Sequence, residues 1–177
     1  MFHLLGEYIT YLVGAVGTGG SLCGTTRALR DLGCHQLTTI GVEPVGSVIF
    51  GGPGLNYHQS GTGTPEGAEI GPVIEYELID KGVKVSDKQA FNTARYLAKH
   101  YALMVGGSAG GVIYEALQAL KTAPADSVFV VLVCDGGEKY LDTLFNDDWM
   151  AKHDLIDINI EQELDDLLTQ YKPAARA

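Results

Sequence analysis

The stretch Tyr11–Gly24, YLVGAVGTGGSLCG, combines a short apolar run, a cluster of glycines and the beginning of a helical pattern. The apolar residues predict a buried strand that ends at Val16, Gly17–Gly20 predict a tight loop, and Ser21–Leu32 predict a helix. A strand that runs through glycines into a helix N-terminus presents backbone N–H groups at the positive end of the helix dipole. The stretch therefore predicts an anion site, with a phosphate group as its expected occupant.

The segments that follow extend this unit into an α/β pattern. A second strand over Leu37–Val42 completes a strand–helix–strand unit, which implies parallel strands. The most apolar run, Val128–Val133 (VFVVLV), predicts a central parallel strand buried on both faces. Shorter strands are expected at Val83–Val85 and Leu103–Val105. The predicted fold is a three-layer α/β structure, an open and mostly parallel sheet with helices on both faces.

Helical signals account for much of the remaining sequence. Ser86 with Gln89 three residues later forms a capping-box pattern, which predicts a helix start. Gly33 is placed to end the helix that begins at Ser21. Further helices are expected over Val112–Leu120, from Gly137 through Phe145, and over Asn159–Tyr171, with Lys172–Ala177 as a tail. The glycine-rich segment from Val45 to Asp80 predicts a long loop.

Three predicted strands end in unusual loops, namely Val16–Gly20, Gly106–Gly110 (part of the glycine-rich turn Gly106–Gly111), and Cys134–Gly137. In an open parallel sheet the carboxyl ends of the strands lie at one edge, and ligands bind there. We therefore expect these three loops to form one site.

Composition excludes several classes of protein. The 177 residues carry a formal net charge of −10 and no lysine or arginine cluster, which argues against nucleic acid or an anionic membrane as partner. No apolar run reaches the length that spans a bilayer, and the first residues lack the pattern of a signal peptide. The odd number of cysteines, with Cys23 and Cys134 in apolar surroundings, predicts reduced thiols and a cytoplasmic protein. Neither the cysteines nor the five histidines have metal-binding spacing, so no metal site is expected.

The loop Gly17–Ser21 has other interpretations besides phosphate binding. It could be only a tight turn. A P-loop is excluded because Gly20 stands where that motif requires lysine. A Rossmann dinucleotide site is the main rival, since Gly17 and Gly19 fit its first two glycines and Glu43 stands where an acid would hold a ribose. Its third glycine position is Leu22, which leaves that fingerprint incomplete.

Five motifs, taken together and in order, point to a known family. They are Gly17-Thr18-Gly19-Gly20-Ser21, Val42-Glu43-Pro44, Gly61-Thr62-Gly63, Gly106-Gly107-Ser108-Ala109-Gly110, and Asp135-Gly136-Gly137-Glu138-Lys139-Tyr140-Leu141. From about Tyr8 to Met150 the chain resembles pyridoxal-phosphate enzymes of the tryptophan-synthase-β type (fold type II), and within them cysteine synthases and cystathionine β-synthases.

The resemblance implies a role for each matched position. The phosphate of pyridoxal 5′-phosphate would be held by Gly17, Thr18, Gly19, Gly20 and Ser21. Ser108 would hydrogen-bond the pyridine nitrogen, and Gly61–Gly63 would face the bound cofactor. Asp135 would lie near the ring edge, next to Cys134, where relatives often have proline. Without the resemblance, Ser108 and Asp135 could each be a plain helix N-cap.

The resemblance also implies that something is missing. In this family the Schiff-base lysine and the loop that binds the substrate carboxylate precede the phosphate loop, and neither has a counterpart here. We therefore expect the large C-terminal domain of such an enzyme, with residues 1–150 binding the cofactor and residues 151–177 forming an acidic helix and tail. No residue of the chain is predicted to be catalytic.

The leading interpretation is the cofactor-binding portion of an enzyme that performs β-replacement or β-elimination on serine or O-acetylserine. The amino-acid substrate would bind only together with the missing half. A non-catalytic remnant that binds a phosphate-bearing ligand or a partner is the alternative. In this family, strands outside this chain add to the sheet, and their absence would leave an unpaired edge and exposed apolar surface. A homo-oligomer is therefore expected.

Overall fold

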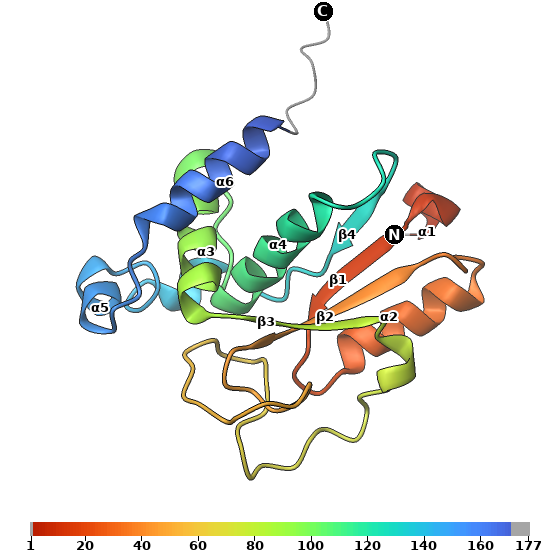
Figure 1. Ribbon diagram of the computed structural model, residues 1–177, viewed down its shortest axis with the longest axis horizontal. Helices are drawn as coiled ribbons and strands as arrows, with labels where there is room; N and C mark the ends of the chain where they lie inside the picture. The colour runs from red at the N-terminus through yellow and green to blue at the C-terminus, as the bar shows by residue number, and fades with distance from the viewer. Residues whose placement is uncertain (1, 171–177) are drawn as a thin grey trace, which may run out of the picture.

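The computed structural model describes residues 2–170 as a parallel sheet of four strands with helices on both faces (Figure 1). The strands are β1 (Tyr11–Ala15), β2 (Thr38–Pro44), β3 (Lys81–Val85) and β4 (Phe129–Val131). The α-helices are α1 (Phe2–Leu5), α2 (Gly20–Asp31), α3 (Asp87–Tyr101), α4 (Gly107–Leu120), α5 (Asp147–Lys152) and α6 (Ile158–Gln170). Three short 3-10 helices are η1 (Gly6–Tyr8), η2 (Tyr76–Leu78) and η3 (Gly137–Tyr140). The predicted α/β fold class is confirmed.

The strand order is β3-β2-β1-β4, and every neighbouring pair is parallel. Figure 1 shows α2 below the sheet and α3 and α4 on its other side, with α6 packed outside α3. Because all the strands run in one direction, the loops that follow them open at the same edge of the sheet.

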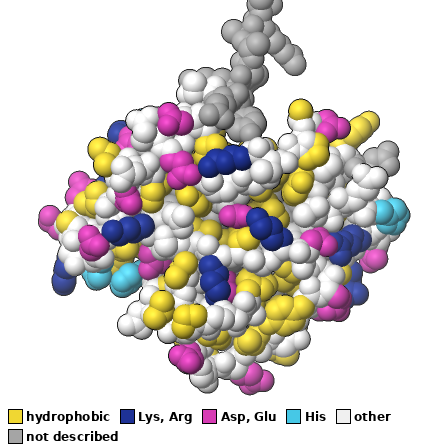
Figure 2. All heavy atoms as spheres, in the orientation of Figure 1, with side chains coloured by type: hydrophobic (Ala, Val, Ile, Leu, Met, Phe, Trp, Pro, Cys, Tyr) yellow, Lys and Arg dark blue, Asp and Glu magenta, His cyan; other side chains and the backbone are white. Residues whose placement is uncertain are grey.

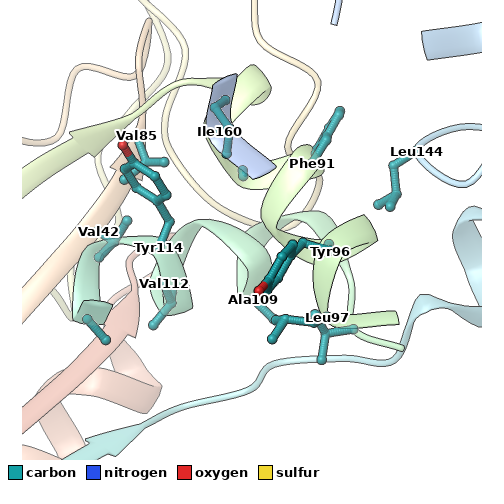
Figure 3. Packing of buried hydrophobic residues seen from close by; sticks show 14 of the residues in the cluster. Val42, Val85, Phe91, Tyr96, Leu97, Ala109, Val112, Tyr114, Leu144 and Ile160 are labelled. Carbon is teal, nitrogen blue, oxygen red and sulfur yellow. The ribbon is translucent and has the colours of Figure 1, made fainter. Parts of the chain in front are cut away.

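Alternating side chains of β1 divide the interior into two cores. On one side of the sheet, Leu12 of β1 and Val16, directly after β1, belong to the same core as Leu22 and Leu29 of α2. Val13 faces the other side of the sheet, where it belongs to the core formed with α3, α4 and α6. Figure 3 shows many residues of this core. This alternation is what a strand covered on both faces requires, because successive side chains point to opposite sides.

Two local signals in the sequence are confirmed. Ser86 is the N-cap of α3, and its hydroxyl accepts from Gln89 N at 3.3 Å while the Gln89 side chain accepts from Ser86 N at 2.9 Å. Gly33 directly follows the last residues of α2 with φ of +108°, a left-handed conformation that favours glycine. The glycine-rich segment between β2 and β3 is a long loop interrupted only by η2, as predicted.

The prediction for Val128–Val133 was wrong in one respect. The segment does contain a parallel strand, β4, but this strand lies at the end of the sheet and, among the described residues 2–170, pairs only with β1. Its residues are only partly buried, and Val133 is 51% exposed. An apolar run shows that a strand is suited to burial, yet its place in the sheet depends on which partners are present.

The strand predicted at Leu103–Val105 is also absent, and only an isolated bridge joins Val105 to Gly136. Nor is Gly106–Gly111 a turn, because α4 begins at Gly107. These glycines allow α4 to approach α3 closely. A Cβ on Gly107 would come within 2.4 Å of Phe91, and one on Gly110 within 2.2 Å of the Ala90 carbonyl oxygen.

The C-terminal helix α6 covers most of the predicted segment, and Ile160 and Leu164 bury their side chains against the α3–α4 layer. The end of that prediction, Tyr171, and the tail Lys172–Ala177 lie outside the described residues. Across residues 2–170, no helix has the length and apolar character needed to cross a membrane. On the face drawn in Figure 2, lysine and arginine side chains are scattered among acidic ones, without a continuous basic surface.

Candidate functional site

The loop from β1 to α2 has the geometry of an anion-binding turn. Gly19 adopts φ of +87°, and its carbonyl accepts the first helical hydrogen bond, from Cys23 N at 2.9 Å. The N–H groups of Gly20, Ser21 and Leu22 therefore precede the first residue that has an intrahelical acceptor. They lie at the positive end of a helix of 12 residues, where an anion is stabilised.

The segment Gly61–Gly63 lies directly against this loop. Gly63 N and the Thr62 hydroxyl both donate to Val16 O, at 2.8 and 3.0 Å. A Cβ on Gly17 would come within 3.0 Å of Gly61 O. The family resemblance implied that both glycine segments adjoin the cofactor, and in the structure the two segments are in contact.

A third segment forms the opposite wall. Gly71 approaches the backbone of Thr18, where an added Cβ would lie 3.1 Å from Thr18 Cα, and Ile74 lies against Gly19. These three segments border an open pocket of about 340 Å³. It is lined by Gly17, Thr18, Gly61, Gly63, Thr64, Pro65, Ala68, Glu69 and Gly71. None of these described lining residues is a lysine or arginine. An anion in this pocket would therefore have backbone N–H and hydroxyl groups as its donors, and the Glu69 carboxylate of the lining would oppose its binding.

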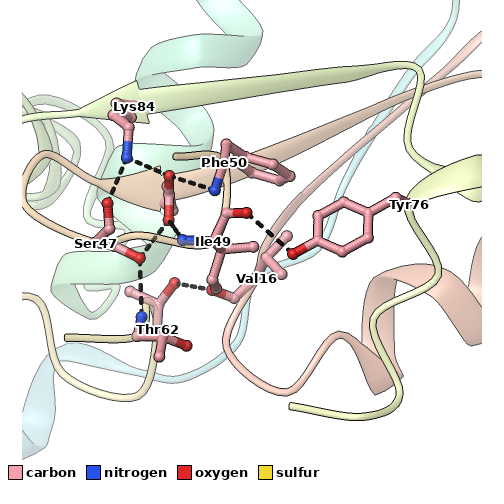
Figure 4. Close-up of polar contacts among 9 residues, drawn as sticks. Val16, Ser47, Ile49, Phe50, Thr62, Tyr76 and Lys84 are labelled. Carbon is pink, nitrogen blue, oxygen red and sulfur yellow. Dashed lines mark hydrogen bonds and ion pairs between the residues drawn. The ribbon is translucent and has the colours of Figure 1, made fainter. Parts of the chain in front are cut away.

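A buried carboxylate connects several segments of this region through hydrogen bonds, and its partners Ser47, Ile49, Phe50 and Lys84 are labelled in Figure 4. Glu43, at the end of β2, is fully buried and accepts from the N–H groups of Ile49 and Phe50, both at 3.0 Å. It also accepts from the Ser47 hydroxyl and pairs with the Lys84 ammonium. Burying a carboxylate is costly unless it is paired and hydrogen-bonded, and here both conditions are met.

The Glu43 network has two consequences. The Ser47 hydroxyl accepts from Thr64 N at 2.8 Å, so the network fixes the loop that contains Gly63. The carboxylate has no capacity left for a ribose hydroxyl, and it is inaccessible to one. The role that a Rossmann site would require of Glu43 is therefore not available.

Gln59 and Asp87 fix the other end of that loop. The Gln59 side chain is buried and donates to Val85 O at 3.0 Å and to Asp87 at 3.1 Å. Asp87 also accepts from His58 N at 2.6 Å. This contact could not be predicted from local sequence patterns, because it joins residues 28 positions apart.

Ser108 lies in the first turn of α4 and is buried, with 6% of its surface exposed. It is not the N-cap, which is Gly106. Its side chain hydrogen-bonds the thiol of Cys134, which follows β4, and the Ala15 backbone contacts the same thiol. Ser108 is therefore placed beside the carboxyl ends of β1 and β4, a few residues from the Gly17 loop.

The prediction that Cys134 lies in apolar surroundings was wrong, because the residue is exposed to solvent. Enough protein surrounds the sulfur that burial raises the pKa of the Cys134 thiol, and the nearby Asp135 carboxylate raises it further. Hydrogen bonds from Ser108 and from the Ala15 backbone act in the opposite direction without reversing the shift. Cys134 thus remains a protonated thiol at neutral pH.

Asp135 joins the same group of residues. Its Oδ2 accepts from the Tyr140 hydroxyl at 2.7 Å and lies 3.4 Å from Lys139 Nζ. Its Oδ1 is buried and has no hydrogen-bond partner among the described residues. Gly136, not Asp135, caps η3, and no side chain caps that helix, so the N-cap interpretation of Asp135 was wrong.

Tyr140 is a site residue that the sequence reasoning did not single out. Burial raises the pKa of its hydroxyl, and the hydrogen bond to Asp135 raises it further. The signal was present in the sequence, because Tyr140 belongs to the motif that begins at Asp135. Within residues 2–170, no group of three or more histidine, cysteine or carboxylate side chains is arranged to hold a metal ion.

Comparisons with known proteins found similar sequences and a similar structure. The family model described as "Pyridoxal-phosphate dependent enzyme" matches residues 1–135. A putative cysteine synthase of Sinorhizobium fredii is 50% identical over 161 residues, which are 91% of this chain and 48% of that protein. A probable cysteine synthase of Bacillus subtilis is 34% identical over 78% of this chain and 44% of its own length.

A solved structure is similar as well. The crystal structure of an O-acetylserine dependent cystathionine β-synthase from Helicobacter pylori matches with a TM-score of 0.74 and 32% sequence identity. The match covers 80% of this chain and 45% of that one. The chain thus spans about half the length of the relatives named here.

Proposed function

The chain belongs to the family of pyridoxal-phosphate dependent enzymes, and from this premise we propose that it is the cofactor-holding portion of a cysteine-synthase-like enzyme. The whole enzyme would perform β-replacement or β-elimination on serine or O-acetylserine. The observation that supports the proposal is the pocket between Gly17 and Thr18, in the loop that leads into α2, and the Gly61–Gly63 segment. A phosphate there would lie close to the positive end of the α2 dipole.

The residues of the site fit pyridoxal phosphate. The loop Gly17–Ser21 would hold the phosphate through its backbone N–H groups and the hydroxyls of Thr18 and Ser21. Ser108 would meet the pyridine nitrogen. A neutral hydroxyl at that position leaves the nitrogen unprotonated, which suits β-elimination and β-replacement. When bound, the cofactor supplies the electron-withdrawing ring that this chemistry needs.

Asp135 and Tyr140 would border the same ring. The hydrogen bond from Tyr140 fixes one carboxylate oxygen and leaves Oδ1 buried without a partner. A buried polar atom without a partner is costly, so a hydrogen-bond donor on a ligand would be favoured there. We propose that Asp135 positions the loop that begins at Cys134 rather than reacting itself.

The covalent part of the chemistry is proposed to lie outside this chain. Its eight lysines are Lys81, Lys84, Lys88, Lys99, Lys121, Lys139, Lys152 and Lys172. None occupies the sequence context in which the family carries its Schiff-base lysine. Lys139 is the lysine found within the site, where it is 64% exposed and pairs with Asp135. We therefore expect cofactor binding without turnover of O-acetylserine or serine.

Titration with pyridoxal phosphate tests this function. The cofactor's absorbance should change saturably on binding to the chain, and replacing Ser108 by alanine should weaken the affinity about 2- to 10-fold through loss of one hydrogen bond. Ser127→Ala, at the opposite edge of the sheet, is the matched control and should leave the affinity unchanged. Saturable binding of NAD without binding of pyridoxal phosphate would contradict the proposal, as would turnover of O-acetylserine by the chain alone.

The exposed edge of β4 suggests an assembly. The other edge strand, β3, carries Lys81 and Lys84, which discourage strand addition, whereas no charged residue occurs between Val128 and Val133. We propose that a second copy of the chain covers this edge. In sedimentation velocity, Val133→Lys should shift the chain from dimer towards monomer, while Leu32→Lys, on another exposed apolar residue, should not. A monomeric unaltered chain would contradict the proposal.

The cysteines support a reducing compartment. Cys23 and Cys34 are buried, and their thiols lie 3.8 and 3.6 Å from the backbone carbonyl oxygens of Glu75 and Gly6. These contacts are those of thiol groups. We propose the cytoplasm as the location of the protein.

A further inference from the structure

A second, smaller pocket lies beside the candidate cofactor site and is not used by the function proposed above. Its volume is about 150 Å³, and it is lined by His58, Ser60, Phe91, Gly107, Tyr140, Thr143, Leu144 and Trp149. Phe91 and Leu144 are 3% and 1% exposed and belong to the larger hydrophobic core. The base of the pocket is therefore apolar and rigidly held.

Aromatic rings form one side of this pocket. The Trp149 ring centroid lies 6.2 Å from that of Phe91 and 5.3 Å from that of His58, with His58 edge-on to the indole. The backbone N–H of His58 donates to the Asp87 carboxylate at 2.6 Å, and this hydrogen bond holds His58 in place. Gly107 leaves room for the Phe91 ring, which a Cβ at that position would displace. An aromatic ligand in the pocket could make edge-on or tilted contacts of the same kind with these rings.

The polar groups of the pocket lie at its entrance. Ser60 and His58 are exposed, and the side chains of Ser60 and Tyr140 are hydrogen-bonded to one another. No lysine, arginine or carboxylate contributes to the lining among the described residues. A charged ligand would lose its hydration without gaining a counter-ion, whereas a neutral apolar one would gain by burial.

We propose that this pocket is a binding site for a small neutral aromatic group. Cavities of about 150 Å³ with aliphatic and aromatic walls are known to bind benzene, so one ring is the expected limit of size. Because Tyr140 and Gly107 belong to this pocket and also adjoin Asp135 and Ser108, an occupant lies next to the candidate cofactor site. The pocket thereby offers a place for the apolar group of a substrate or effector.

Toluene is a suitable probe, and the chain contains its own reporter. Trp149 is the single tryptophan of the sequence, so its selectively excited emission reports on this pocket. Toluene should change that emission saturably, and benzylammonium, which has a similar shape but a positive charge, should not. Leu144→Phe should weaken the toluene affinity at least about tenfold, because its larger ring occupies the space that the ligand needs.

Two further variants keep the test decisive. Thr143→Leu narrows the pocket from its partly exposed side and should weaken binding even if Leu144→Phe disturbs folding. Leu141→Phe makes the same type of change on a residue that is 55% exposed and should leave the affinity unchanged. An emission change that does not saturate, or that is equal in the unaltered chain and in Thr143→Leu, would overturn the proposal.

Discussion

Replacing Glu43 by alanine should lower the free energy of unfolding by about 3–5 kcal/mol, the cost of breaking a buried ion pair on one side only. The substitution would leave the Lys84 ammonium without its counter-ion in a site where its side chain is only 29% exposed. It would also remove the acceptor of Ile49 N, Phe50 N and the Ser47 hydroxyl. Buried donors without acceptors add to the loss.

Urea denaturation of the variant and the unaltered chain measures this effect. Glu75→Ala is a useful control, because it also removes one carboxylate of an ion pair, with Arg27. The side chains of this pair are 34% and 54% exposed, whereas Glu43 is fully buried. Exposed pairs contribute at most about 1 kcal/mol, so this control should remain close to the unaltered chain. Equal losses in Glu43→Ala and Glu75→Ala would show that burial of Glu43 does not have the importance that its contacts indicate.

The parts of the fold that the sequence predicted correctly are those with local causes. The strand–glycine–helix pattern from Tyr11 onward depends on neighbouring residues, as does the capping box of Ser86 and Gln89. Gly33 likewise ends α2 through its own backbone conformation. Each of these signals operates within a few residues, so no knowledge of distant contacts was needed.

The errors arose where distant contacts decide the structure. Gly106–Gly111 suggested a turn because glycines are frequent in turns, but Gly107 and Gly110 serve the close approach of α4 to α3. The run Val128–Val133 suggested a central strand because it is apolar, although its partners place it at an edge. Composition alone could not distinguish these cases.

The candidate site shows the same division. Parallel topology predicted that the segments of Ser108 and Asp135 would lie at the same edge of the sheet as the loop that follows β1. In the structure, Cys134 contacts both Ser108 and the Ala15 backbone at the end of β1. Tyr140 stands within the motif that begins at Asp135, but its hydrogen bond to Asp135 could not be predicted from that motif. The hydrogen bond between Gln59 and Asp87 could not be predicted either, because each of these side chains has many other possible partners. The geometry of the site thus depends on side-chain contacts that the sequence motifs do not specify.

Gly19→Ala should abolish binding of pyridoxal phosphate and lower the free energy of unfolding by about 2–5 kcal/mol, the sum of two costs. The first is the left-handed backbone, since Gly19 has φ of +87°. The second is steric, because the new Cβ would lie 2.6 Å from Ile74 Cγ1 and 2.8 Å from Ile74 Cα. The backbone of Ile74 cannot rotate away as a flexible side chain can, so the loop itself must shift and its N–H groups lose their common direction.

Gly33→Ala separates the two costs. Gly33 also has a left-handed backbone, with φ of +108°, but an added Cβ meets no atom within 4 Å. This control should lose only about 1–2 kcal/mol and should bind pyridoxal phosphate as the unaltered chain does. Both variants are compared by urea denaturation and by absorbance titration at a temperature where each is folded. If Gly19→Ala were folded and bound the cofactor with unchanged affinity, the phosphate could not be held by the loop between β1 and α2.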